Sequence, residues 1–161
     1  RIQVIEGSIT ELALKGDDAG QFGVRPMLDA VLAERPSRLA TLERQLLLIN
    51  GRPGMRIEDT AIEEIGTASG DFRLILSLKT WHVFTSFGID NLGSSSVGPW
   101  QSYGTAAFNS YLAPGDSLVF NLSTTPGDPR QLAFGRLSYD VPVGTDGARY
   151  WPLPSTPDVT P

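Results

Sequence analysis

Residues 37–54, SRLATLERQLLLINGRPG, read as one amphipathic helix with a defined end. The apolar side chains of one helical face recur at i, i+3, i+7 and i+10, and they are Leu39, Leu42, Leu46 and Ile49. Ser37 can cap the start of this helix, because its hydroxyl can accept a hydrogen bond from an N–H group of the first turn. Asn50-Gly51-Arg52-Pro53-Gly54 ends it. The stretch therefore predicts a helix that packs one face on a core.

The segments around this helix predict the rest of an α+β domain. They are a strand at Ser8–Lys15, a helix at Val24–Arg35 stopped by Pro36, an imperfect strand at Met55–Ile65 and a clean strand at Phe72–Lys79. In the first strand, strict alternation places Thr10 with Leu12 and Leu14 on one face and Ile9 on the other. The predicted order is β-α-α-β-β. Because two helices can cover only one face of a three-stranded sheet, the other face and at least one edge should stay open.

Charged and aromatic residues divide the 161-residue chain into two parts. Residues 1–80 carry 22 of the 31 Lys, Arg, Asp and Glu residues, whereas 12 of the 14 Phe, Trp and Tyr residues follow residue 80. We place a domain boundary near Lys79-Thr80-Trp81 on this shift. The sequence thus predicts one domain at 1–79, a series of strands at 80–150 and a proline-rich tail at 151–161, which does not continue as a strand.

The second part predicts an antiparallel meander of about four strands. The candidate strands are Trp81–Asp90, Gln101–Leu112, Asp116–Thr124 and Gln131–Val141. Each has roughly the 9–11 residues that a tilted transmembrane strand needs. Leu118, Phe120 and Leu122 form an apolar face, opposite polar residues, but a soluble antiparallel sheet would show the same alternation. In the last segment the apolar alternation changes phase after Phe134, which indicates a bulge or a misplaced boundary. Four strands cannot close a barrel, since the smallest natural ones have about eight.

Composition excludes several classes of function. The absence of cysteine rules out disulfides and thiolate chemistry, and the net charge of -5 without a Lys/Arg cluster argues against a nucleic-acid partner. His82 is the only histidine, so a plain strand position is a better interpretation than catalysis. Asp17-Asp18-Ala19-Gly20 and Asp146-Gly147 read as turns, because neither has the ligand spacing of a calcium loop. We therefore expect no enzyme activity, no metal and no cofactor.

The second predicted strand is the candidate binding site. An extended peptide can add to an open sheet edge, with main-chain hydrogen bonds giving affinity and side-chain pockets giving selectivity. The candidate polypeptide-binding residues are Met55, Arg56, Ile57, Glu58, Asp59, Thr60, Ala61 and Ile62. The charges on this strand allow a second interpretation, because charged edges also prevent unwanted pairing. Residue patterns alone favour this protective role.

Short motifs in order along the chain resemble one family. They are Glu6-Gly7-x-Ile9, Leu42-Glu43-x-x-Leu46-Leu47-Leu48-Ile49-Asn50-x-x-Pro53-Gly54, Asp90-Asn91-x-Gly93, Gly98-x-Trp100-Gln101, Pro114-Gly115-Asp116, and Leu137-Ser138-Tyr139-x-Val141-Pro142-Val143-Gly144-x-Asp146-Gly147. The series resembles the second polypeptide-transport-associated (POTRA) domain and first barrel strands of the two-partner secretion transporters, in the hemolysin secretion/activation (ShlB/FhaC/HecB) family of the Omp85 superfamily.

This resemblance implies a role in protein transport. Members of the family sit in the Gram-negative outer membrane, surrounded by its lipid, with their docking domains in the periplasm. These domains capture a secreted adhesin or hemolysin by strand addition at the edge strand and in a groove beside a helix, which here would be Met55–Ile65 and a helix that the sequence does not specify. The family's later barrel strands and lid-loop motif are missing from this chain, so we expect a fragment that could associate through its edges. The alternative is a free-standing soluble protein-binding module with a β-sheet second half.

Overall fold

A computed structural model describes residues 7–16, 19–66, 70–93, 98–128, 130 and 133–151. The chain divides into two compact units. The first comprises Arg1–Thr80 with Val143–Ala148, and the second comprises Trp81–Pro142 with Arg149–Pro161. Both strands and helices are present, which confirms the α+β class.

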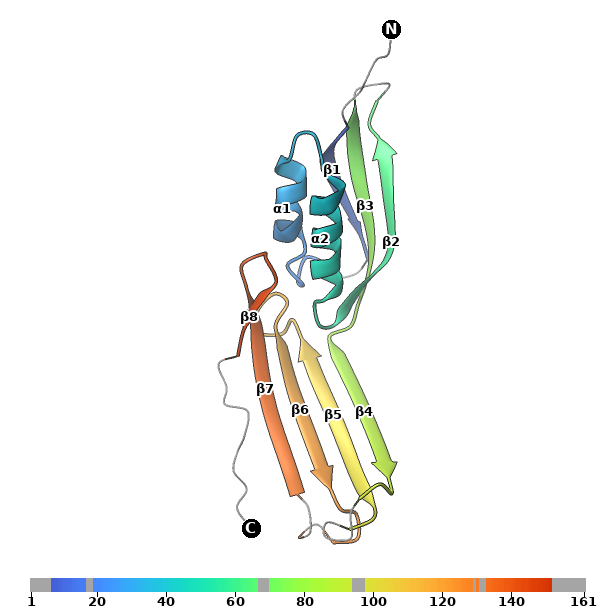
Figure 1. Cartoon of the computed structure of the whole chain (residues 1–161), viewed down its shortest axis with the longest axis vertical. Coiled ribbons are helices and arrows are strands. Elements are labelled where there is room, and N and C mark those ends of the chain that lie inside the picture. The colour runs from blue at the N-terminus through green and yellow to red at the C-terminus, as the bar shows by residue number, and fades with distance from the viewer. Residues whose placement is uncertain are drawn as a thin grey trace. The chain divides into compact units, whose positions relative to one another are not determined.

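The first unit follows the order β-α-α-β-β. Its elements are β1 (Ser8–Lys15), α1 (Arg25–Ala33), α2 (Leu39–Asn50), β2 (Met55–Glu64) and β3 (Asp71–Thr80). The sheet order is β1-β3-β2, with β1 parallel and β2 antiparallel to the central β3. Both helices lie on one side of this sheet (Figure 1), and they share a core with the buried Leu74, Leu76 and Leu78 of β3.

The prediction for Ile9 was wrong, and a bulge in β1 is the reason. Ile9 is opposite Phe72, and the pairing shifts between Ile9 and Glu11, so Thr10 is an extra residue in the strand. The extra residue moves Ile9 to the face that carries Leu12 and Leu14. Ile9 is accordingly buried with the helices' apolar side chains.

Ser37 also differs from its predicted role. The N-cap residue of α2 is Arg38, which makes no side-chain cap hydrogen bond. The Ser37 hydroxyl instead accepts a hydrogen bond from the Ile9 N–H at 2.8 Å. The serine therefore joins the α1–α2 connection to the edge of β1.

The second unit contains one antiparallel meander that is not closed. The sheet order is β4 (Val83–Asp90), β5 (Gln101–Asn109), β6 (Ser117–Thr124), β7 (Ala133–Val143) and β8 (Ala148–Tyr150). The prediction of about four strands was too low by one, because the short β8 pairs with β7 through a hairpin. Pairing between β6 and β7 is regular from Ala133 to Asp140, so Phe134 lies on the opposite face from Leu137 without a bulge.

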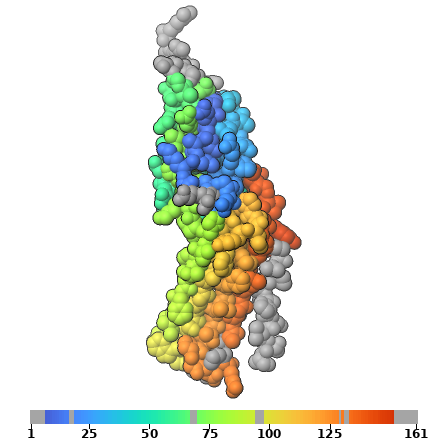
Figure 2. Space-filling view, turned by 180° about the vertical axis from the view of Figure 1, so that it is seen from behind, coloured from blue at the N-terminus to red at the C-terminus, as the bar shows by residue number. Residues whose placement is uncertain are grey.

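The two faces of this sheet differ in polarity. Directly paired residues share a face. One face carries mainly apolar residues in four strands: Val83, Phe87, Ile89, Ala106, Phe108, Leu118, Phe120, Leu122, Leu137 and Tyr139. The other carries mainly polar ones: Ser86, Asp90, Gln101, Thr105, Asn109, Ser117, Asn121, Ser123, Arg136, Ser138 and Asp140. The rear view in Figure 2 shows the surface of these strands, from the green of β4 to the orange of β7.

The apolar face has no core beneath it. Among the residues that the structure describes, every buried apolar side chain belongs to the first unit, and the last of them is Leu78. Phe87 is 78% exposed and Leu122 is 66% exposed. The buried side chains of the second unit are instead polar, including Asn109, Asp116 and Ser117. Within the described ranges, neither helix is long and apolar enough to cross a lipid bilayer.

Candidate functional site

The predicted binding residues lie along an edge strand of the first sheet. β2 is hydrogen-bonded only to β3 in that sheet, so its other side is open in the described part of the unit. Met55 is buried, Ile57 and Ala61 are half-buried, and the remaining predicted residues are exposed: Arg56, Glu58, Asp59, Thr60 and Ile62. The strand continues to Glu64, two residues beyond the predicted set.

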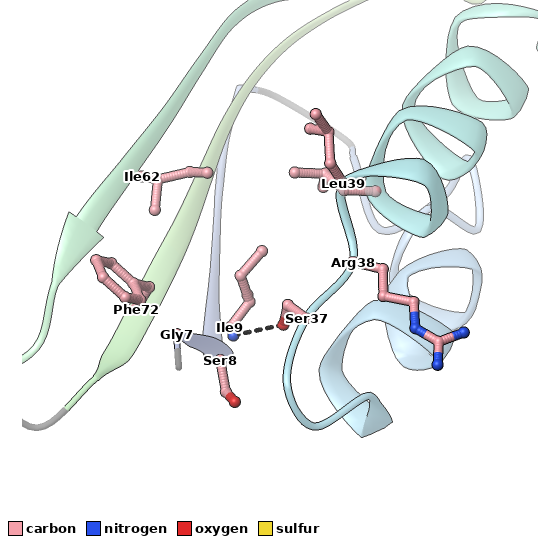
Figure 3. Close-up of a pocket in the computed structure, with 9 residues that line it drawn as sticks. Gly7, Ser8, Ile9, Ser37, Arg38, Leu39, Ile62 and Phe72 are labelled. Atoms are coloured by element: carbon pink, nitrogen blue, oxygen red, sulfur yellow. Dashed lines mark hydrogen bonds between the residues drawn. The ribbon is translucent and has the colours of Figure 1, made fainter. Parts of the chain in front are cut away.

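A groove lies where β2 approaches the start of α2. It has a volume of about 290 Å³. Its lining is mostly apolar and comes from four segments: Gly7, Ser8, Ile9, Ser37, Arg38, Leu39, Leu42, Ile62 and Phe72. Ile62 and Leu39 point toward each other from β2 and α2 (Figure 3), and they are 51% and 68% exposed. Two large apolar side chains thus face solvent across one hollow beside an open edge.

Phe72 and Gly7 form the end of this groove. An added Cβ at Gly7 would lie 2.8 Å from the Cε2 atom of Phe72. Such a distance is shorter than real carbon contacts allow, so any larger residue at position 7 would displace the ring. The glycine in the Glu6-Gly7-x-Ile9 motif therefore leaves room for the aromatic ring at the end of the groove.

The other edge of the sheet is covered at its start. The N–H of Ile9 donates to Ser37, and the C=O of Ile9 accepts from Arg35 Nη1 at 3.3 Å. The N–H of Ser37 donates to the C=O of Gly7 at 3.1 Å. Because the α1–α2 connection occupies these backbone groups of β1, β2 is the more open of the two edges.

Acidic side chains dominate the surface around β2. Glu58, Asp59, Glu63 and Glu64 are all exposed, against Arg56 on the same strand. Of these, Glu58 lies 3.7 Å from Lys79 in an exposed pair. Arg38 lines the groove, but its guanidinium points away from the space between Ile62 and Leu39 (Figure 3) and lies 3.5 Å from Glu34. The edge therefore presents a negative potential to a partner.

His82, the residue considered for catalysis, makes structural contacts. His82 Nδ1 lies 2.9 Å from the Asn109 carbonyl oxygen, and its ring contacts Tyr111 edge-on with centroids 5.8 Å apart. No group of three acidic, histidine or cysteine side chains in the described ranges could hold a metal ion. Asp17 and Asp18 lie outside the described residues.

Sequence patterns missed one wall of the groove. The residues at the start of α2 read as part of one apolar stripe, yet Leu39 lies beyond the core and faces Ile62. The only available signal was the position of Leu39 in the first turn of the helix. The structure therefore identifies α2 as the helix beside the candidate site, which the sequence left open.

Two solved structures share the fold of this chain. CdiB from Escherichia coli is similar with a TM-score of 0.64 and 23% sequence identity, over 87% of this chain and 26% of that chain. CdiB from Acinetobacter baumannii is similar with a TM-score of 0.56 and 19% identity, over 86% of this chain and 26% of that chain. At these identities the comparison shows a common fold, and this chain spans 26% of the length of either structure.

No protein-family model and no curated protein sequence matches the chain.

Proposed function

We propose that this chain is the polypeptide-capturing part, together with the first barrel strands, of an outer-membrane two-partner secretion transporter. Residues 1–79 would form a periplasmic POTRA-like docking domain for a secreted polypeptide of the adhesin or hemolysin type. Residues 80–150 would begin a barrel wall in the Gram-negative outer membrane. In this proposal the chain binds and guides a polypeptide and performs no covalent chemistry.

The observation that carries the proposal is an open edge strand with an apolar groove beside it. Edge strands offer unpaired backbone groups that bind extended peptides, and an adjoining pocket selects their side chains. β2 has an open side, and Ile62 belongs to both the strand and the groove. This arrangement fits recognition of polypeptide rather than of a small molecule, since the groove is shallow and its lining has few polar groups.

The second sheet supports the membrane part of the proposal. Its apolar face carries exposed Phe87, Phe120 and Leu122, with no apolar core in the described residues of that unit. Monomeric soluble proteins rarely expose a large contiguous apolar surface. A lipid-facing strand alternates apolar outward with polar inward residues, as β6 does with Leu118, Phe120 and Leu122 against Asn121 and Ser123.

The fold likeness to CdiB supports a role related to two-partner secretion. CdiB proteins are transporters of the Omp85 family, and they transport a secreted polypeptide partner. The part of CdiB that is similar to this chain includes counterparts to both units, because it covers 87% of the chain.

A capture experiment tests the proposal. The full chain in mild detergent is immobilised and exposed to the amino-terminal region of the secreted polypeptide encoded beside it. We expect saturable binding that Ile62→Asp weakens at least about tenfold, because a charge would then have to be buried in the apolar groove. Leu47→Asp is the matched control, since Leu47 is an exposed apolar residue of α2 that does not line the groove.

Two results would contradict the proposal. Absence of binding to that polypeptide at concentrations of about 100 μM would remove the transport role, because a dissociation constant above this value corresponds to less than about 5.5 kcal/mol of binding free energy. Equal losses in the Ile62→Asp and Leu47→Asp variants would remove the groove from the binding site.

A further inference from the structure

We propose that β2 accepts a partner strand only along its last four residues, 61–64, and that the partner is an extended segment with a branched apolar residue flanked by basic residues. This inference rests on the proposed function only in that the partner is a polypeptide. It adds the register, the boundary and the chemistry of the bound segment.

The hydrogen bonds between β2 and β3 determine which backbone groups point outward. The Ile65 N–H donates to the Asp71 carbonyl oxygen at 2.8 Å. In an antiparallel pair, residues that bond the partner strand alternate with residues whose N–H and C=O groups point away from it. With the observed register, Asp59, Ala61 and Glu63 bond β3. The backbone groups of Thr60, Ile62 and Glu64 are therefore directed to the open side.

The rest of the same edge, residues 55–60, is closed by three local features. The pairing shifts between Ile57 and Asp59, so Glu58 is a bulged residue that breaks the regular row of outward groups. The Ile57 N–H donates to Asn50 Oδ1 at 2.8 Å. The Thr60 N–H donates to the Asp59 carboxylate at 2.9 Å. Natural proteins use such bulges and charged groups to prevent strand pairing.

The open part of the edge coincides with the groove. A strand added at Ile62 would place the residue opposite Ile62 on the same side of the sheet. On that side lies the hollow of about 290 Å³ between Ile62 and Leu39. A branched apolar side chain at this position would cover both exposed side chains. Strand pairing and side-chain burial therefore both favour the register in which the partner's apolar residue lies opposite Ile62.

Charge favours basic residues on either side of that apolar one. Glu63 lies on the opposite face of β2 from Ile62, directly across from one residue flanking the apolar one, and Asp59 on that same face would be the diagonal neighbour of the other flanking residue. Arg73 is paired with Glu63 in the register, but its guanidinium binds Glu11 through Nε and Nη2 at 2.8 and 2.6 Å. Glu64 adds a third exposed carboxylate next to the groove. Lysine or arginine in the partner would complement these groups.

A second copy of this chain is a poorer occupant of the same edge. Two β2 strands in contact would bring two sets of Asp59, Glu63 and Glu64 together, and like charges across a strand pair are destabilising. The acidic edge thus favours a basic partner over self-association.

The test uses a fluorescein-labelled peptide, Lys-Thr-Lys-Ile-Lys-Thr-Lys, and the full chain in a non-ionic detergent. Proline at position 62 removes an outward N–H that the peptide needs, whereas proline at position 57 removes one that Asn50 already occupies. We expect Ile62→Pro to weaken binding about tenfold or more and Ile57→Pro to change it less than about twofold. The same peptide with glutamate in place of lysine should bind at least about tenfold more weakly.

Hydrogen exchange of the unaltered chain provides a readout that needs no variant. We expect the peptide to slow exchange of the Ile62 and Glu64 amides and to leave the Ile57 amide unchanged. Four results would each overturn the inference. They are equal losses of peptide binding in the two proline variants, slower exchange of the Ile57 amide, equal binding of the glutamate peptide, and dimerisation through β2 without peptide. If one of these results is obtained but the chain still captures the secreted polypeptide, the inference fails and the proposed function stands. If the peptide binds at Ile62 but the chain does not capture the secreted polypeptide, the proposed function fails and the inference stands.

Discussion

Gly16 ends β1 in a backbone conformation that side chains rarely adopt. Its φ is +118°, and an added Cβ would lie 2.1 Å from the carbonyl oxygen of Leu78 in β3. We expect Gly16→Ala to lower the unfolding free energy of the first unit by about 1–3 kcal/mol, or more if the two strands must separate. This change in unfolding free energy is measured by titrating the chain with urea and monitoring unfolding of the first unit through hydrogen exchange of the β3 amides.

Gly20 supplies the control for that prediction. An added Cβ at Gly20 meets nothing within 4 Å, so Gly20→Ala should change stability by less than about 0.5 kcal/mol. Equal losses at positions 16 and 20 would show that loss of glycine flexibility in general, rather than the contact with Leu78, is responsible.

Single residues also mark where sequence patterns stop being sufficient. The apolar character of Ile9 was evident, but a one-residue bulge decided which face it occupies. The hydroxyl of Ser37 was available for a helix cap, yet the nearby Ile9 N–H took it. Both outcomes depend on the approach of β1 to the α1–α2 connection, which neither local segment encodes.

At the scale of elements, the β5–β6 turn depends on one carboxylate. Asp116 is 1% exposed. It accepts hydrogen bonds from the N–H groups of Tyr111, Leu112 and Ala113 at 3.0, 3.1 and 2.9 Å, and from the Tyr139 hydroxyl at 3.0 Å. This network explains why the Pro114-Gly115 turn is followed by an aspartate.

We expect Asp116→Ala to loosen this turn. Loss of an ionised acceptor should lower the free energy of local opening by about 1.5–3 kcal/mol, seen as faster amide exchange at 111–113. Tyr139→Phe removes one of the bonds and should have a smaller effect on the same amides. Unchanged exchange in Asp116→Ala would mean that strand pairing alone holds the turn.

Elements with strong periodicity were predictable, and short or composite ones were not. The strand Phe72–Lys79 matches β3, and the helix of residues 37–54 matches α2, because each repeats its pattern over several turns or pleats. β8 has only 3 residues, too few for an alternation to be recognised. The groove beside β2 depends on how far α2 extends over the sheet, which a linear pattern does not specify.

At the scale of the whole molecule, the two units bury their apolar residues differently. The first unit has a core of Phe22, Leu28, Ile49 and their neighbours, so it meets the ordinary requirement of a folded domain. The described part of the second unit presents its apolar residues on one exposed sheet face instead. The contrast in composition on either side of residue 80 indicated this difference. Composition does not specify whether lipid or protein covers the apolar face.

Site-directed spin labelling of β6 in lipid vesicles tests the account most directly. The chain has no cysteine, so a single introduced one is the only attachment site. We expect labels at 118, 120 and 122 to be accessible to oxygen in the lipid, and labels at 119, 121 and 123 to be accessible to a water-soluble nickel complex, with a period of two residues. Labels at 118, 120 and 122 that are shielded from both reagents would show that protein covers the apolar face, which would contradict the transporter account and favour a soluble binding module.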